Sequence, residues 1–253
     1  MHQSELIALW RAEEEVAHVH GWDFSHIDGR YEEEDDIPWS YREEILARLT
    51  PDMRILDIDT GGGEFLRSLG HPNENTAATE AFPPNVALCK AELLPLGIDF
   101  REGNGTGPLP FGDGEFDLVI NRHGDFDPRE IHRVLKPGGL FITQQVGADN
   151  DRELVKLLLG DLPLPFPDQC LSAASQAFRN AGFEILDGGE HYGSIRFFDV
   201  GALVWFARII VWEFPGFSVD TCLPRLLEAE KLLRERGSLD GRTHRFLLIT
   251  KKV

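Results

Sequence analysis

The sequence predicts an α/β fold, with a doubly wound, mostly parallel sheet that is covered by helices on both faces. Three observations carry this prediction. Strand and helix signals alternate five times at short spacing between residues 55 and 145, which is typical of βα units with right-handed crossovers. The first strand runs into three successive glycines and then a helix, the opening of a Rossmann-like sheet. At 253 residues and 42% apolar content, the chain can bury a large core.

The strand–glycine–helix junction spans Ile55 to Leu66. Its strand is apolar because a central strand of such a sheet is buried. Gly61, Gly62 and Gly63 allow unusual backbone dihedrals and the close approach of a ligand, since no Cβ is in the way. The helix start offers unpaired N–H groups and a partial positive charge. Taken alone, the segment also fits a plain glycine-rich turn between a core strand and a helix.

The other elements follow from hydrophobic periodicity and from glycine and proline stop signals. Helices are expected over residues 4–19, 43–49, 64–69, 83–94, 128–135, 152–159, 169–181, 199–211 and 223–236. Strands are expected over 55–58, 76–79, 98–101, 116–120, 140–145, 183–186, 193–198 and 245–250. Lys136 to Gly139 are expected to form the turn that ends helix 128–135. Trp205, Phe206 and Trp212 either fill a core or line a pocket.

The expected organisation is an N-terminal helix with an aromatic lid, a ligand-binding core, and substrate-side helices with closing strands, at residues 1–45, 46–150 and 151–253, the last two forming one domain, 46–253. Trp22 and Trp39 lie in a segment without a clear period. That segment either covers a substrate or is a strap packed on the core. The acidic run from Glu32 to Asp36 is expected to be a solvated loop.

Polar residues follow the predicted strands where each strand ends. Glu80 lies 19 residues after Gly61, close to the spacing at which such folds place a carboxylate on ribose hydroxyls. Both hydroxyls can donate to one carboxylate, a charge-assisted pairing. Ligands bind parallel sheets at the carboxyl ends of the strands. The residues expected there are Gly61, Glu80, Asn104, Asn121 and Gln144.

The charge and the cysteine content limit the classes of partner and the cellular compartment that the sequence predicts. The 43 acidic and 25 basic residues give a net charge of −18, which repels phosphate backbones and makes nucleic acid a poor partner. Three scattered cysteines without a CxxC pair predict a reducing compartment and no structural zinc, so no metal site is expected. No signal peptide or membrane-spanning run is visible, which predicts a cytoplasmic protein without a membrane partner.

The sequence also holds four ordered segments: LDIDTGGGE (56–64), ATE (78–80), GNGTGPLPFGDGEFDLVIN (103–121) and RVLKPGGLFITQQVG (133–147). Together they resemble the class I S-adenosylmethionine-dependent methyltransferases, especially the subgroup with small-molecule and quinone-biosynthesis members. A strand ending FDLVIN and followed by RVLKPGG is specific to that family. The resemblance implies a seven-stranded sheet with an antiparallel last strand, and S-adenosylmethionine as the cofactor.

The resemblance further implies roles for individual residues. Gly61 and Gly63 would let the turn pass under the methionine part of the cofactor, and Glu80 would bind its ribose. Asn104 stands where the family usually has an aspartate at the adenine amine, so its carbonyl oxygen would accept a weaker, neutral hydrogen bond. The full set implied to bind the cofactor is Asp57, Asp59, Thr60, Gly61, Gly63, Glu80, Ala81 beside the adenine, Asn104, Gly105, and Asn121 and Arg122 near the amino-acid end.

Asp59 departs from the family pattern, which usually has glycine at this position. Aspartate tolerates unusual backbone conformations better than most residues. It also brings a carboxylate close to where the carboxylate of the cofactor should lie. We expect weaker cofactor binding if Asp59 points at the ligand, and little effect if it points away or meets Arg42 or Arg122.

The expected reaction is methyl transfer from the sulfonium to an O, N or C atom of a small-molecule acceptor. The methyl group is already activated, so the protein mainly orients an in-line attack and removes a proton. His123 is the candidate base, because it follows the fourth strand and titrates near neutral pH. The alternative is a histidine that only forms pocket wall or loop surface. Side chains available to orient or roof the acceptor are Gln144, Gln145, Trp10, Trp22 and Trp39.

Two other functions are alternatives to methyl transfer. A NAD(P)-dependent oxidoreductase needs GxGxxG, but Leu66 stands at the third glycine position and RVLKPGG has no role in such an enzyme. Asp59 and the neutral Asn104 favour a different alternative, a protein that keeps the fold and binds the cofactor but is inactive or regulatory. Cofactor binding without turnover on any acceptor would favour that alternative.

Overall fold

The computed structural model describes residues 2–18, 24–33 and 36–253. The chain forms two compact units that are interleaved in sequence: unit 1 takes residues 1–37, 148–167 and 192–244, and unit 2 takes 38–147, 168–191 and 245–253. Residues 46–147 of the predicted core therefore lie in unit 2. No helix within the described ranges is both long and apolar enough to cross a membrane.

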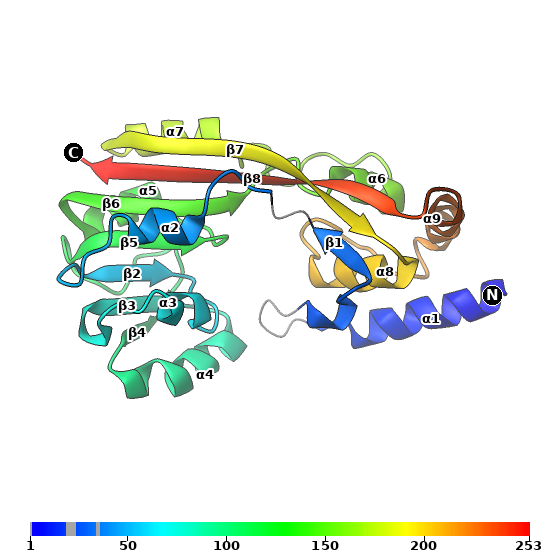
Figure 1. Cartoon of the computed structure of the whole chain (residues 1–253), viewed down its shortest axis with the longest axis horizontal. Coiled ribbons are helices and arrows are strands. Elements are labelled where there is room, and N and C mark those ends of the chain that lie inside the picture. The colour runs from blue at the N-terminus through cyan, green and yellow to red at the C-terminus, as the bar shows by residue number, and fades with distance from the viewer. Residues whose placement is uncertain (1, 19–23, 34–35) are drawn as a thin grey trace. The chain divides into compact units, whose positions relative to one another are not determined.

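Seven strands form the sheet in the described part of unit 2, and Figure 1 shows them in the order β4-β3-β2-β5-β6-β8-β7. Their bounds are β2 Ile55–Ile58, β3 Thr76–Glu80, β4 Asp99–Glu102, β5 Phe116–Arg122, β6 Leu135–Val146, β7 Phe183–Phe197 and β8 Leu239–Lys252. The pairs among β2 to β6 are parallel, whereas β8 is antiparallel to β6. The predicted mostly parallel sheet with an antiparallel last strand is confirmed. The sheet has eight strands in the described residues instead of the seven expected, because β1 (Tyr31–Glu33) pairs with β7 at its edge.

Alternate residues of the central strands face two helical layers. Ile55 packs with the first layer and its neighbour Leu56 with the second. The first layer is α2 (Tyr41–Leu46), α3 (Glu64–Ser68) and α4 (Pro83–Glu92), and the second includes α5 (Pro128–Val134) and α7 (Leu171–Asn180). Because both faces of the sheet are covered, every residue of β2 is buried, which explains its continuous apolar run.

Unit 1 has its own apolar core. It is built on α1 (Gln3–Val16), α6 (Arg152–Leu159), α8 (Val200–Ile209) and α9 (Leu223–Arg236), with a short 3-10 helix at Ser25–Ile27. Two further 3-10 helices, Asn73–Asn75 and Leu94–Leu96, belong to unit 2. Trp205 and Phe206 are buried in this core, so core filling is the correct alternative for them, whereas Trp212 is exposed. The strand β1 (Tyr31–Glu33) pairs antiparallel with the end of β7. Part of the acidic run predicted to be a loop is therefore a strand.

The segment Lys136 to Gly139 is not a separate turn. β6 begins at Leu135, directly after α5, and Leu135 pairs with Phe116 before the register shifts to Leu118 and Leu140. Gly138 has a φ of +77°, which allows the irregularity inside the strand. The glycines thus bend a strand that continues instead of closing the helix.

The two strands predicted over 183–186 and 193–198 are a single strand, β7. Its glycines accept close neighbours: a Cβ added at Gly188 would lie 3.0 Å from Leu171, and one at Gly189 would lie 3.0 Å from Trp39. These glycines therefore mark close packing within the strand and not a break between two strands. β8 likewise extends beyond its prediction and begins at Leu239.

Candidate functional site

The predicted site residues lie at one edge of unit 2, where the parallel strands end. Asp59 follows β2, Glu80 closes β3, and Asn104 follows β4. Asn121 and Gln144 lie near the ends of β5 and β6 and are separated by one register position. The parallel pairing brings these residues together, because the carboxyl ends of parallel strands share one edge.

The glycine turn leaves β2 in an unusual conformation. The Thr60 N–H donates to the Thr79 carbonyl at 3.0 Å, and the Gly63 N–H donates to the Thr60 carbonyl at 3.1 Å. Gly61 and Gly63 have φ values of +66° and +81°. A Cβ added at Gly61 would meet nothing within 4 Å, whereas one at Gly63 would lie 2.6 Å from Leu93. Gly61 therefore faces open space, and Gly63 is needed for helix packing.

The Glu80 carboxylate is fixed beside that open space. Its Oε2 accepts the Gly61 N–H at 2.9 Å, and its Oε1 accepts the N–H groups of Ala81 at 2.8 Å and Phe82 at 2.9 Å. Asn85 adds a longer contact of 3.4 Å to Oε2. A carboxylate has about four acceptor positions. Oε1 is fully used, so a ligand hydroxyl would take the place of the longer Asn85 contact on Oε2.

Asp57 is a buried carboxyl group beneath the turn. Thr60 Oγ1 donates to its Oδ2 at 2.6 Å, which ties the turn to the end of β2. Burial raises the pKa of Asp57 to about 7, and the neighbouring charges of Asp59 and Glu80 raise it further in the same direction. Asp57 therefore acts as an anchor of the turn.

Asp59 has a φ of +56°, the left-handed region that its usual glycine counterpart adopts without strain. Its carboxylate accepts the backbone N–H of Gly105. It also packs against Gly124, where an added Cβ would lie 2.5 Å from Asp59 Oδ2. Burial raises the pKa of Asp59 to about 7, and repulsion by Glu80 contributes.

Neither arginine considered as a partner of Asp59 takes that role. Arg42 donates to the Ser68 carbonyl at 3.1 Å, and the Arg122 guanidinium lies 5.7 Å from the centre of the Phe65 ring. Asp59 is thus held by the loop after β4 and not by a positive side chain.

The Asn104 side chain is hydrogen-bonded to other residues of its own loop after β4. Asn104 Oδ1 accepts from Thr106 Oγ1 at 3.1 Å and from the Gly107 N–H at 2.9 Å. An amide oxygen has two lone pairs, so an adenine amine would have to replace one of these donors. Gly105 must be glycine, because an added Cβ would lie 2.0 Å from the Asp125 carbonyl oxygen.

The ends of β5 and β6 hold a buried amide network. Asn121 Nδ2 donates to the Ile58 carbonyl at 3.0 Å, and Asn121 Oδ1 accepts from Gln145 Nε2 at 2.6 Å. The same Gln145 nitrogen lies 2.7 Å from Thr143 Oγ1, and Tyr41 donates to the Asn121 carbonyl at 3.1 Å. The side chains of Asn121 and Gln145 are fully or almost fully buried. Their hydrogen bonds join strand ends to one another.

His123 lies next to Gln144 and Trp39. Trp39 Nε1 donates to Gln144 Oε1 at 2.9 Å, which turns the Gln144 amide nitrogen toward His123 Nε2 at 3.5 Å. His123 has a φ of +65° and an exposed surface, yet protein atoms crowd the rest of the ring. This desolvation lowers its pKa, and the charges of Arg245 and Arg122 lower it further. The imidazole is therefore uncharged at neutral pH.

The other two tryptophans named for the acceptor roof do not join this group. Trp10 is 2% exposed in the core of unit 1. Trp22 lies outside the described residues.

Three residues of the site were not identified from the sequence. Cys89 donates from its thiol to the Gly61 carbonyl at 3.0 Å, and burial with the nearby Glu80 raises its pKa to about 12. Phe82 is 45% exposed directly beside Glu80. Tyr41 anchors β5 from α2. Only Phe82 had a usable signal, its place two residues after Glu80.

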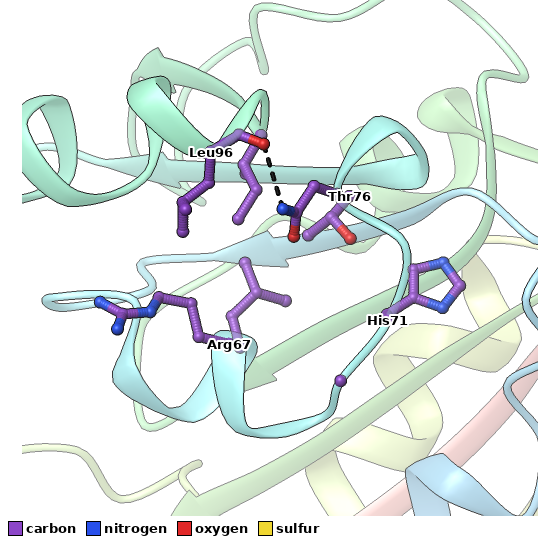
Figure 2. A pocket seen from close by; sticks show the side chains of 8 residues that line it. Arg67, His71, Thr76 and Leu96 are labelled. Carbon is purple, nitrogen blue, oxygen red and sulfur yellow. Dashed lines mark hydrogen bonds between the residues drawn. The ribbon is translucent and has the colours of Figure 1, made fainter.

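A pocket of about 260 Å³ lies at the opposite edge of the sheet (Figure 2). It is lined by Leu66, Arg67, Gly70, His71, Asn73, Thr76, Leu96 and Ile98. Thr76 and Ile98 stand at the amino ends of β3 and β4, far along the strands from Glu80. Asn73 Nδ2 donates to the Leu96 carbonyl at 3.0 Å across it, the dashed line in Figure 2. Within the described ranges no group of three His, Cys, Asp or Glu side chains is placed to hold a metal ion.

Comparison with known proteins shows similarity to methyltransferases. Residues 56–143 match the family described as "Methyltransferase domain". The demethylmenaquinone methyltransferase of Thermus thermophilus is 34% identical over 119 residues, which are 43% of this chain and 54% of that protein. The phthiotriol/phenolphthiotriol dimycocerosates methyltransferase of Mycobacterium tuberculosis is 28% identical over 190 residues, 71% of this chain and 66% of that protein. The chain thus spans about half the length of the first relative and two thirds of the second.

A solved structure shares the fold. It is that of a protein from Bacillus halodurans C-125 that carries a provisional name as a methyltransferase. That structure superposes on this one with a TM-score of 0.57 at 17% sequence identity. The superposition covers 83% of this chain and 96% of that one. These findings confirm the resemblance that the four sequence segments carry.

Proposed function

We propose that this chain, whose residues 56–143 match the methyltransferase domain family, is a class I enzyme that transfers a methyl group from S-adenosylmethionine to a small-molecule acceptor. One observation carries the proposal. The open backbone of Gly61 and the fixed carboxylate of Glu80 meet through a 2.9 Å hydrogen bond at the carboxyl edge of the sheet. This combination fits a ligand that has a ribose and a second polar arm.

The residues of this edge fit the cofactor. A ribose hydroxyl would take the place of the longer Asn85 contact on Glu80 Oε2, and the exposed Phe82 ring and Ala81 stand where a base would follow the ribose. Gly61 leaves room for the methionine part. The cofactor supplies a methyl group already activated on its sulfonium. The remaining residues assigned to its binding are Asp57, Asp59, Thr60, Gly63, Asn104, Gly105, Asn121 and Arg122.

The protein then has to orient the acceptor and accept a proton. His123 is uncharged at neutral pH, so its imidazole has a lone pair for the acceptor proton. Because the Gln144 amide nitrogen can only donate, its contact favours a lone pair on His123 Nε2 and the proton on Nδ1. Gln144 and Trp39 thereby set the tautomer of the candidate base. The acceptor hydroxyl would take the place of the 3.5 Å Gln144 contact at Nε2 to reach that lone pair. A base with a lowered pKa suits an acceptor whose own proton is acidic, such as a phenol or quinol.

The names of the relatives support an acceptor of this kind. One relative is named for demethylmenaquinone and the other for phthiotriol-type lipids. We propose a partly apolar small molecule as the acceptor. All three cysteines are free thiols, which supports a reducing, cytoplasmic setting.

Calorimetric titration with S-adenosylmethionine and with S-adenosylhomocysteine tests the proposal. We expect both to bind, and Glu80→Gln to weaken both at least about tenfold, because a neutral amide accepts ribose hydroxyls less well. Glu102→Gln is the matched control, since Glu102 is an exposed carboxylate one strand away that pairs with Lys90. Absence of binding of either ligand to the unaltered protein would overturn the proposal.

A second candidate is a protein that binds the cofactor without catalysis. The internal hydrogen bonds of Asn104 and the charged Asp59 favour it, because both depart from the usual site. Incubation with labelled S-adenosylmethionine and a panel of quinols, phenols and hydroxylated lipids separates the two candidates. Label transfer to any acceptor supports the enzyme, whereas tight binding without transfer supports the inactive or regulatory protein.

A further inference from the structure

The glycine turn carries three carboxyl groups, and within the described residues none of them is hydrogen-bonded to a positive side chain. The charge of Arg122 lowers the pKa of Asp57 from a distance, but burial raises that pKa more. Asp57 and Asp59 flank the end of β2, and Glu80 stands opposite on β3. Their hydrogen-bond donors are neutral: Thr60 Oγ1 for Asp57, backbone N–H groups for Asp59 and Glu80, and the Asn85 amide at a longer distance. Neutral donors orient these groups but cancel none of their charge. The turn therefore has a negative potential that a bound cation would relieve.

The Asp59 carboxylate is fixed in place directly before the glycine turn. The Gly105 N–H holds its carboxylate from one side, and Gly124 blocks it from the other. It is only partly exposed, so solvent screens its charge less than that of a surface carboxylate. The acids that face it are Asp57 on β2, Glu80 on β3 and Asp125 after β5.

We propose that Asp59 makes this site select the positively charged methyl donor over its neutral product. The inference rests on the proposed function. When the methyl group leaves with its bond to sulfur broken, the electron pair of that bond stays on sulfur, and the sulfonium becomes a neutral thioether. The donor and the product otherwise share the same adenosine and amino-acid parts. Any contact with those parts cancels in the ratio of the two affinities, and the Coulomb attraction of Asp59 to the sulfonium does not cancel.

The same arrangement couples donor binding to a proton. The pKa of Asp59 is raised to about 7 by burial and by Glu80, so the group is partly protonated at neutral pH. A nearby cation favours the ionised form and lowers this pKa. Binding of the donor near pH 7 should therefore release a fraction of a proton from Asp59, and binding of the neutral product should release less.

The test is calorimetric titration of both ligands at pH 7 in two buffers of different ionisation enthalpy. Three proteins are compared: unaltered, Asp59→Asn, and Asp113→Asn as a control that removes the same formal charge from an exposed site 83% accessible to solvent. We expect Asp59→Asn to lower the donor-to-product affinity ratio by about tenfold, as expected for one charge at short range in a medium of intermediate dielectric. Proton release on donor binding should fall in this variant and stay unchanged in Asp113→Asn.

Three results would contradict the inference. An unchanged affinity ratio in Asp59→Asn would mean that the carboxylate does not sense the sulfonium. Equal strengthening of both ligands would mean that it acts only by repelling the carboxylate that they share. If neither ligand binds the unaltered protein, the proposed function fails and the inference fails with it. Circular dichroism and thermal midpoints of the three proteins establish that each is folded.

Discussion

The carboxyl ends of β2 and β3 differ from those of β5 and β6, although all four belong to one sheet edge. The first pair ends in charged side chains and open glycine backbone, with Gly61 facing free space beside Glu80. The second pair ends in neutral amides that bond one another, with Asn121 and Gln145 buried. One half of the edge presents charged side chains and open backbone to a ligand. The other half bonds mostly to itself, although Gln145 Oε1 is buried without a hydrogen-bond partner in the described residues.

The two halves of the edge therefore have different roles: the first is open to a ligand, and the second holds the strand ends in place. A buried network whose members mostly bond one another is rigid and costly to interrupt. The amide network therefore fixes β2, β5 and β6 in place, and the charged turn can remain electrostatically unfavourable until a ligand binds. Mutations on the two halves should accordingly affect different measurements.

Asn121→Leu should have the largest effect, and on stability. The leucine leaves the buried Ile58 carbonyl without its Asn121 donor. It also removes one of the acceptors of Gln145 Nε2, which keeps those of Thr143 and Gly124. We expect the free energy of unfolding to fall by about 3 kcal/mol, measured by urea denaturation. Asn73→Leu removes an exposed amide that bonds the Leu96 carbonyl, and should cost less than about 1 kcal/mol. Equal losses in the two variants would remove the distinction between the halves of the edge.

Asp59→Asn should have an intermediate effect that depends on pH. The folded pKa of about 7 exceeds the unfolded value near 3.8, so the folded state binds more protons between these values. Stability attributable to Asp59 therefore decreases as pH rises from about 4 to 7 and is constant above that. The asparagine variant should be more stable than the unaltered protein by about 1–3 kcal/mol at pH 8, with the difference vanishing near pH 4. Denaturation at both pH values measures this, and a constant difference would refute it.

Trp39→Phe should have the smallest effect. It removes the N–H that holds Gln144 Oε1, so the amide is free to turn and present its oxygen to His123. We expect a loss of about 1 kcal/mol in stability and a rise in the pKa of His123, followed by NMR titration of the imidazole. Tyr192→Phe, a change on an exposed aromatic ring, serves as the control. An unchanged His123 titration would show that Trp39 does not set the orientation of the amide.

The sequence was sufficient for the features that depend on local pattern. Residue spacing predicts the glycine turn, the position of Glu80 and the alternation of strands and helices along the chain, because βα units repeat with fixed geometry. The amide network could not be predicted in the same way. Asn121 and Gln145 lie on different strands, and only the register of the sheet makes them partners. The residue pattern along the chain does not determine which residues of two neighbouring strands lie side by side.

Two elements were wrongly divided for a related reason. Gly138 and Gly188 signal turns in a sequence, but in the structure they lie within β6 and β7. The hydrogen bonds from neighbouring strands outweigh the local preference of glycine. The backbone of Asp59 illustrates the opposite case. Its positive φ was compatible with the residue type, but the Gly105 N–H that holds it comes from a loop about 45 residues away.

The antiparallel pairing of β8 with β6 has a consequence for synthesis on the ribosome. Val146 pairs with Arg245, so about 100 residues must be made before the edge of β6 receives its partner. At about 5–20 residues per second, that edge waits for roughly 5–20 seconds with unpaired N–H and carbonyl groups. The nascent protein is most exposed to strand-to-strand aggregation in this interval, and a chaperone that binds extended apolar segments would act there.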